Sequence, residues 1–284
     1  MSRYPDCFNR LAKRQEGALV PFTMVGDPDI EGSLAVIDAL VAGGADALEL
    51  GIPFSDPVAD GPVIQSAHIR ALAAGTTASS AFTLLGTIRS RYPDIPIGLL
   101  VYANLVHSLG LATFYEMCAT VGVDSVLIPD VPIRESAPFT NAARNAGIDP
   151  VYIAPPSATQ PTLDAVATAT HGYVYAVSRV GVTGTDQEAE TTDLPKIVAG
   201  LRTAASAPIL LGFGISQPTH VRAALVAGAD GAITGSAVVK IIESHVAVWE
   251  QEPTTAQVQS LQQELEAFIA SMKAATHRPE LVSP

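Results

Sequence analysis

The chain has 284 residues, of which 48% are hydrophobic and 15% are charged, so it can bury a large core and is not intrinsically disordered. Its formal net charge of −12 opposes binding to nucleic acid or to an anionic membrane surface. An anionic substrate would therefore be held by local backbone donors rather than by a positive surface.

Eight short apolar segments recur along the chain, and helical patterns separate them. In chain order they cover residues 19–23, 47–50, 97–101, 125–128, 150–153, 172–176, 208–211 and 231–234. Strands that alternate with helices form parallel sheets, and eight such units favour a closed barrel over an open sheet. A last segment, residues 254–276, has apolar side chains on one helical face and is predicted to be a closing outer helix. No linker divides the chain, so we expect one α/β domain over residues 1–284, a (β/α)8 TIM barrel with extra N-terminal and loop helices.

Four of these strands follow the same tripeptide, Gly-x-Asp. The tripeptides end at Asp46, Asp124, Asp149 and Asp230. The glycine can end a helix in the left-handed conformation, and an apolar run after it suits a strand that is buried on both faces. The repeat therefore supports a helix-to-strand junction at each of the four places.

Three further features indicate the compartment and the kind of chemistry. The N-terminus lacks the apolar core of a secretory signal, and the most apolar stretch is interrupted by Asn104 and His107. Cys7 and Cys118 are far apart and lack metal-ligand spacing, so we interpret them as reduced thiols. The histidines form no ligand set, and we expect most of them on helix surfaces or in loops. We therefore expect a cytoplasmic protein without a membrane span or a metal site.

One carboxylate lies inside a predicted strand. Glu49 falls within residues 47–50, near the strand end at which TIM barrels build their active sites. Either orientation of its side chain leads into apolar surroundings, where an unpaired carboxylate is costly and its pKa tends to rise. We interpret Glu49 as a general acid/base at the barrel mouth, the alternative being an ion pair with a helix residue.

Asp60 has two interpretations that its neighbours leave about equal. The sequence Asp60-Gly61-Pro62 precedes an apolar helical pattern, which is typical of a helix N-cap followed by an early proline. The other interpretation is a catalytic carboxylate in the loop after a strand. We expect Asp56 to shape or line this loop, and Asp130 either to line the mouth or to stabilise its own loop.

Glycines follow the last two predicted strands, in residues 212–216 and 235–237. Small residues before a helix present backbone N–H groups to an anion, and loops at these two strand positions are the usual phosphate site of a TIM barrel. We predict a phosphate site here, with plain tight turns as the alternative. The polar segment 178–186 after the sixth strand is expected to be a lid over the substrate, or else an ordinary crossover.

These motifs resemble those of the tryptophan synthase alpha chain family. The likeness is carried by residues 21–28, 48–65, 102–104, 178–184 and 212–216, and it extends over nearly the whole chain. It implies a lyase of L-tryptophan biosynthesis that cleaves indole-3-glycerol phosphate to indole and D-glyceraldehyde 3-phosphate in a retro-aldol step. The chain departs from the family pattern at Val180, a lid position that is often small and polar, and in the acidic stretch after Gly184.

The resemblance also implies roles for individual residues. Glu49 matches the family's acid/base, and Asp60 matches the carboxylate that binds the indole N–H group. The residues that match substrate contacts are Phe22, Leu100, Leu127, Ile153, Tyr175 and Thr183. The residues that match the phosphate site are Gly184, Gly214, Ile215, Gly235 and Ser236, with Ser216 nearby.

The resemblance further implies a partner. This is a β subunit that carries pyridoxal phosphate in an αββα heterotetramer and receives indole, while no cofactor is expected in this chain. The contact surface is expected at Pro53, Asp56, Pro57 and Asn104. Two alternatives stay open: a stand-alone lyase that releases indole, and a non-catalytic barrel that only activates its partner. Retention of both carboxylates argues against the second, and another phosphate-binding barrel isomerase would not explain the loop from Glu49 to Asp60.

Overall fold

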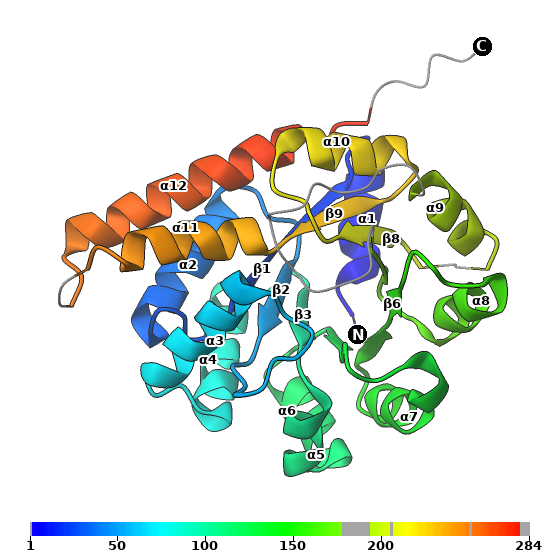
Figure 1. The fold of residues 1–284 in the computed structure, drawn as a ribbon, viewed down its shortest axis with the longest axis horizontal. Helices are drawn as coiled ribbons and strands as arrows, with labels where there is room; N and C mark the ends of the chain where they lie inside the picture. Colours follow the sequence, from blue (N-terminus) through cyan, green and yellow to red (C-terminus); the bar gives the residue numbers. More distant parts are fainter. Residues whose placement is uncertain (1, 178–193, 205–206, 250–251, 279–284) are drawn as a thin grey trace.

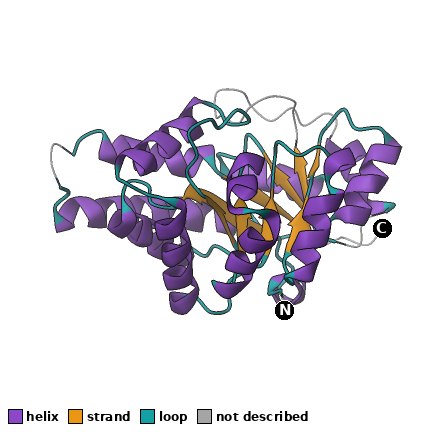
Figure 2. Cartoon of the chain, turned by 90° about the horizontal axis from the view of Figure 1, so that it is seen from below, coloured by secondary structure: helices purple, strands orange, loops and turns teal. Residues whose placement is uncertain are grey.

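The computed structural model describes residues 2–177, 194–204, 207–249 and 252–278. Within these residues, parallel strands form a nearly closed barrel, and helices surround it (Figure 1). The view from below shows the strands in the middle of the molecule and helices on its outside (Figure 2). The prediction of a TIM barrel with additional helices is confirmed.

The described strands form one sheet. Their bounds are β1 (Ala18–Met24), β2 (Leu48–Gly51), β3 (Ile97–Leu100), β4 (Ser125–Leu127), β5 (Asp149–Val151), β6 (Ile153–Ala154), β7 (Val174–Val177), β8 (Ile209–Gly212) and β9 (Gly231–Thr234). All neighbouring strands pair in parallel, in the order β5-β4-β3-β2-β1-β9-β8-β7-β6. The two ends of this order are consecutive in the chain, so the barrel is completed by the chain itself.

The fifth predicted strand is split in two in the structure. Its first part, β5, pairs with β4, and its second part, β6, pairs with β7. Only Tyr152 lies between them, and its hydroxyl group bonds Thr140 Oγ1 at 2.7 Å on the helix side of the barrel. The eight predicted segments therefore correspond to nine strands among the described residues, and this one break accounts for the difference.

Helices cover the outside of the barrel. Their bounds are α1 (Tyr4–Lys13), α2 (Ile30–Ala42), α3 (Pro62–Ala73), α4 (Ala78–Arg91), α5 (Ala103–Leu109), α6 (Leu111–Thr120), α7 (Ala137–Asn145), α8 (Gln160–Ala169), α9 (Leu194–Arg202), α10 (Pro218–Val226), α11 (Ser236–Val246) and α12 (Thr255–Ala274), with a short 3-10 helix at Ile133–Glu135. In the described part of the chain, no single helix is long and apolar enough to cross a membrane; α3 and α4 would pass that test only as a pair, and they meet at 101°.

Helix α12 is the closing outer helix that the sequence predicts. It begins at a capping box, in which Thr254 and Gln257 each satisfy the other's backbone N–H group. Its buried side chains recur at helical spacing: Leu261, Leu265, Ile269 and Met272. This face packs against α2 and α11, beside which α12 runs in Figure 1.

Side chains alternate between the two sides of the barrel wall, and this alternation decides where Glu49 points. In β2, Leu48 and Leu50 join the large core between the strands and the helices. Glu49, between them, must point to the opposite side, into the barrel. Helix α1 closes the other end of the barrel, because its Tyr4 is buried in the same inner cluster as Tyr173 of the barrel interior.

The Gly-x-Asp repeat has a common structural role in three of its four copies. Each aspartate donates its backbone N–H to the carbonyl of one strand residue and accepts that same residue's N–H with its carboxylate, with all six distances between 2.7 and 2.9 Å. The pairs are Asp46 with Leu19, Asp124 with Ile97, and Asp230 with Ile209. In the fourth copy, Asp149 donates its backbone N–H to the Asp124 carbonyl, and its carboxylate bonds Ser2 instead of a strand N–H.

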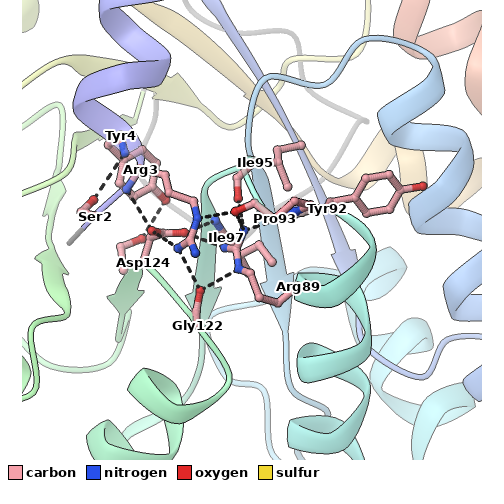
Figure 3. Close-up of polar contacts among 11 residues, drawn as sticks. Ser2, Arg3, Tyr4, Arg89, Tyr92, Pro93, Ile95, Ile97, Gly122 and Asp124 are labelled. Carbon is pink, nitrogen blue, oxygen red and sulfur yellow. Dashed lines mark hydrogen bonds and ion pairs between the residues drawn. The ribbon is translucent and has the colours of Figure 1, made fainter.

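The Asp124 carboxylate also binds two arginines (Figure 3). Arg3 approaches Oδ1 at 3.0 Å and Arg89 approaches Oδ2 at 2.8 Å. Arg89 additionally donates to the carbonyl groups of Gly122 and Ile95. This cluster holds α1 and α4 at the N-terminal end of the barrel, the end that serves stability rather than catalysis in TIM barrels.

Candidate functional site

A pocket opens at the C-terminal ends of the strands, where the fold places its active sites. It holds about 670 Å³ of empty space, including its opening to solvent. The lining residues are Phe22, Glu49, Ala59, Asp60, Ile64, Leu100, Pro129, Ile153, Tyr175, Phe213, Gly214, Ile215, Ser216, Ile233, Gly235, Ser236 and Ala237. Two carboxylates, apolar walls and glycine-containing loops therefore meet in one space, as the strand-end rule predicts.

Glu49 lies in this pocket with only 2% of its surface exposed. Its Oε1 accepts a hydrogen bond of 2.8 Å from the Tyr173 hydroxyl group. Glu49 forms no ion pair with a basic residue in the described part of the chain. Burial raises the pKa of the Glu49 carboxyl from its ordinary 4.5 to about 7; the Tyr173 bond opposes this rise and the negative charge of Asp60 adds to it. A carboxyl with this pKa can both donate and accept a proton near neutral pH.

The floor below Glu49 consists of tyrosines. The hydroxyl group of Tyr4 is 2.9 Å from Ser125 Oγ, and the Tyr4 and Tyr173 rings meet edge to face at a centroid distance of 5.4 Å. Burial raises the pKa of Tyr173 well above its ordinary value, so this hydroxyl keeps its proton and acts as a donor. The floor thus orients the Glu49 carboxyl without supplying a counter-charge.

Glu49 is expected to make the fold less stable as the pH rises. Its pKa is about 7 in the folded chain against an ordinary value of 4.5, so the unfolded chain loses this proton first. The stability that the protonated group contributes is complete below pH 4.5 and is lost as the pH rises through about 7. The difference between the two pKa values corresponds to about 3 kcal/mol of unfolding free energy.

The measurement compares wild type with Glu49→Gln, which cannot titrate. Denaturant unfolding at about pH 4.5 and about pH 8 should show the variant gaining stability relative to wild type at the higher pH. A stability difference that stays constant between the two pH values would contradict the assigned pKa.

Asp60 lines the pocket and is 4% exposed. Its Oδ2 accepts a 2.7 Å hydrogen bond from the Tyr102 hydroxyl group and lies 3.2 Å from His68 Nε2. Helix α3 begins at Pro62 with Gly61 at its N-cap and no side-chain cap within the described residues. The helix-cap interpretation of Asp60 is therefore wrong, because the side chain turns to the pocket wall and not to the first turn of α3.

Five of the six histidines are exposed or half-buried on helices or in loops, as expected, and His68 is the exception. It sits on the buried face of α3 with Ile64, Ala67 and Ala71. The spacing of these residues was visible in the sequence as one helical face, so a buried histidine could have been predicted. His68 and Tyr102 were missed as neighbours of Asp60, as was Tyr173 as the partner of Glu49.

Apolar side chains form much of the pocket wall. Of the predicted substrate contacts, Phe22, Leu100, Ile153 and Tyr175 line the pocket. Leu127 does not: it is buried in the inner cluster, paired in register with Leu100. Leu100 and Ile153 of the pocket wall pack against the same cluster. The structure adds Ile64, Pro129 and Ile233, which were not predicted as substrate contacts.

The glycine-containing loops also line the pocket. Gly214 and its neighbour Phe213 both adopt a positive φ, 75° and 66°, and the Ile215 carbonyl accepts a 2.7 Å bond from the Thr234 hydroxyl. Gly235 is the N-cap residue of α11 and lacks a side-chain cap in the described structure. A Cβ atom on Gly235 would lie 3.3 Å from the Phe22 side chain, so glycine lets the start of α11 approach β1 closely. The start of α11 therefore faces the pocket with backbone N–H groups and the positive end of its dipole.

Two predicted site residues, Thr183 and Gly184, lie outside the described residues, together with the predicted lid and Val180. Among the described residues, no group of three or more His, Cys, Asp or Glu side chains could hold a metal ion.

The loop between Glu49 and Asp60 reaches the surface beside the pocket. Asp56 and Asn104 are exposed and Pro57 is half-buried. Val58, in the loop between Glu49 and Asp60, is 74% exposed. Pro53 is buried, which corrects its expected place on the contact surface. Asp130 accepts the Ala103 N–H at 3.0 Å, so it stabilises the start of α5 rather than lining the pocket.

Comparison with known proteins gives relatives over nearly the whole chain. The family model of the tryptophan synthase alpha chain matches residues 8–277. The tryptophan synthase alpha chain of Corynebacterium diphtheriae is 53% identical over 277 residues, which cover 97% of this chain and 100% of that protein. The alpha chain of Photobacterium profundum is 55% identical over 276 residues, covering 97% and 99%.

Solved structures give the same result. Mycobacterium tuberculosis tryptophan synthase contains a chain that superposes with a TM-score of 0.84 at 26% identity, covering 98% of this chain and 99% of that one. A chain of the tryptophan synthase complex from Pyrococcus furiosus gives a TM-score of 0.77 at 31% identity, covering 91% and 98%.

Proposed function

The chain belongs to the tryptophan synthase alpha chain family and is a lyase, and we propose that its pocket cleaves indole-3-glycerol phosphate to indole and D-glyceraldehyde 3-phosphate. One observation carries the proposal: a buried carboxyl, Glu49, has a pKa of about 7 in a pocket that a helix N-terminus also lines. The first can move protons near neutral pH and the second can hold a phosphate.

The apolar walls suit the flat indole ring of this substrate. Phe22, Leu100 and Ile153 line the same pocket as the carboxylates and the glycine-containing loops. A ring held against them places its N–H group toward Asp60 and its side chain toward Gly214 and the start of α11. The net charge of the chain is −12, so backbone donors at this end are the means of binding a phosphate in an otherwise acidic protein.

The carbon–carbon bond breaks only after indole C3 has gained a proton. The protonated Glu49 carboxyl donates that proton, and the ring becomes an iminium ion. Asp60 accepts the hydrogen bond of the indole N–H and stabilises the positive charge that develops there. The Glu49 carboxylate then takes the proton of the adjacent hydroxyl group, the bond to C3 breaks with its electrons returning to the ring, and an aldehyde leaves. Glu49 ends protonated, as it began.

We further propose a β subunit as the partner, bound at the surface formed by Asp56, Pro57, Val58 and Asn104. Asp56, Pro57 and Val58 are on the loop that carries Asp60 into the pocket, and Asn104 is at the start of α5. A product leaving the pocket beside this loop would pass them. The pyridoxal phosphate of the assembly would belong to that partner. In the family, the indole product would be its substrate.

The experiment is an indole-release assay with indole-3-glycerol phosphate, run with and without a tryptophan synthase β subunit. We expect enzyme-dependent indole formation, co-elution of the two chains, and faster release in the complex. If the β subunit does not change the rate of indole release and the two chains elute separately, the chain is instead a stand-alone lyase. A β subunit activated by a chain that releases no indole would identify a non-catalytic activator and overturn the proposed reaction.

A further inference from the structure

His68 is unusual in having both ring nitrogens engaged inside the apolar face of a helix. Its side chain is 4% exposed, and its helical neighbours on that face are Ile64, Ala67 and Ala71. Nδ1 is 3.0 Å from the backbone N–H of Phe54, and Nε2 is 3.2 Å from Asp60 Oδ2. A buried polar ring on such a face is costly unless both nitrogens are satisfied.

The Phe54 contact determines which nitrogen carries the proton. A backbone N–H can only donate, so Nδ1 must accept, and the proton of the neutral ring is then on Nε2. Nε2 therefore donates to the Asp60 carboxylate. The histidine thus accepts a hydrogen bond from one end of the loop at Phe54 and donates one to the other end at Asp60.

Tyr102 makes the parallel connection from another element. Its hydroxyl group donates to the same Oδ2 at 2.7 Å and accepts the Ala59 N–H at 3.1 Å. Its ring stacks on Phe54 at a centroid distance of 5.5 Å. Two donors, one from α3 and one from the end of β3, therefore converge on a single oxygen of Asp60 and define the plane and rotation of its carboxyl group.

We propose that His68 is a positioning residue for the lyase reaction: its Nε2–H sets the rotation of the Asp60 carboxylate, and its Nδ1 anchors the loop at Phe54. The inference rests on the proposed function, because Asp60 acts on the substrate there. His68 does not line the pocket and touches no reacting atom. Its effect on turnover passes through Asp60 alone, while its effect on the loop passes through Phe54.

Two substitutions separate the two contacts. His68→Asn places an amide oxygen where Nδ1 lies, so it keeps the Phe54 bond and loses the donor to Asp60. His68→Gln reaches the position of Nε2 with its amide N–H, so it keeps the donor to Asp60 and loses the acceptor for Phe54. His171→Gln is the matched control, because His171 is exposed and precedes β7 at the opposite end of the barrel.

Steady-state indole release is measured on the full chain with its β partner. For His68→Asn we expect kcat to fall about tenfold with KM within about twofold, and for His68→Gln we expect kcat within about threefold of wild type. The control should match wild type. Equal kcat for the two His68 variants, or losses that only follow their thermal stability, would overturn the proposal and leave His68 a packing residue.

The ring tautomer provides a readout that needs no substrate. Nitrogen chemical shifts of His68 in the labelled full chain should show Nε2 protonated and Nδ1 bare at neutral pH. A proton on Nδ1 would overturn the proposal even in an active enzyme. A wild-type complex that releases no indole would instead overturn the proposed function, and the tautomer would still decide the geometry of His68.

Discussion

Replacement of Glu49 by glutamine is expected to lower indole release by at least about a thousandfold, with the fold intact. Glutamine has nearly the shape of glutamate, and its amide oxygen can still accept the Tyr173 hydroxyl bond of 2.8 Å. What it lacks is an exchangeable proton with a pKa of about 7. Both proton transfers of the proposed reaction use that proton, so the variant fails at protonation of C3 and at deprotonation of the hydroxyl group.

The measurement is single-turnover indole formation, accompanied by thermal unfolding and by inorganic phosphate binding. Phosphate binding should persist, because Gly214 and the start of α11 are untouched. Asp46→Asn is the matched control for loss of a buried carboxylate, since the Asp46 carboxylate accepts hydrogen bonds from the Leu19 N–H and from Lys273 at the other end of the barrel. The Asp46→Asn variant should have a lower free energy of unfolding than wild type and the same rate of indole release. Near-normal turnover by Glu49→Gln would overturn the mechanism.

The order of strands and helices could be predicted because hydrophobic periodicity is a local signal. The break at Tyr152 could not, because a one-residue interruption within an apolar run leaves the local pattern unchanged. The Gly-x-Asp repeat was equally visible, and it did predict helix-to-strand junctions. Its second role, in which Asp124 binds both backbone groups of Ile97, depends on pairing between strands and has no signal in either segment alone.

In the candidate site, too, the residues with a local sequence signal could be predicted and those that depend on long-range contacts could not. Glu49 could be identified because a carboxylate in an apolar strand is a local anomaly. Its partner Tyr173 lies 124 residues away and reaches Glu49 only through barrel closure. His68 differs, because its spacing from Ile64 and Ala71 already placed it on a buried face. It was missed because the histidines were considered together, as possible metal ligands or as surface residues. Thr183 and Gly184 remain predictions.

Asp60→Asn is expected to lower kcat/KM by about a hundredfold to a thousandfold, the usual effect of losing one electrostatic group at a developing charge. Tyr102 and His68 both direct donors at Oδ2, so the asparagine must turn its only oxygen toward them. The other terminal atom, an oxygen in Asp60, becomes an NH₂ group. An amide donor then faces the indole N–H, and no negative charge stabilises the iminium ion.

A second aspartate of this chain shows what a helix-cap role would look like instead. Asp29 is the N-cap residue of α2 and accepts the Gly32 N–H at 2.7 Å. Asparagine caps helices about as well as aspartate, so Asp29→Asn should change stability by less than about 0.5 kcal/mol and leave turnover unchanged. If Asp60→Asn behaved in the same way in the indole-release assay, Asp60 would have no part in the chemistry. Because α3 begins beyond Asp60 and two side chains hold its carboxylate at the pocket wall, we expect the two variants to differ by at least about a hundredfold in turnover.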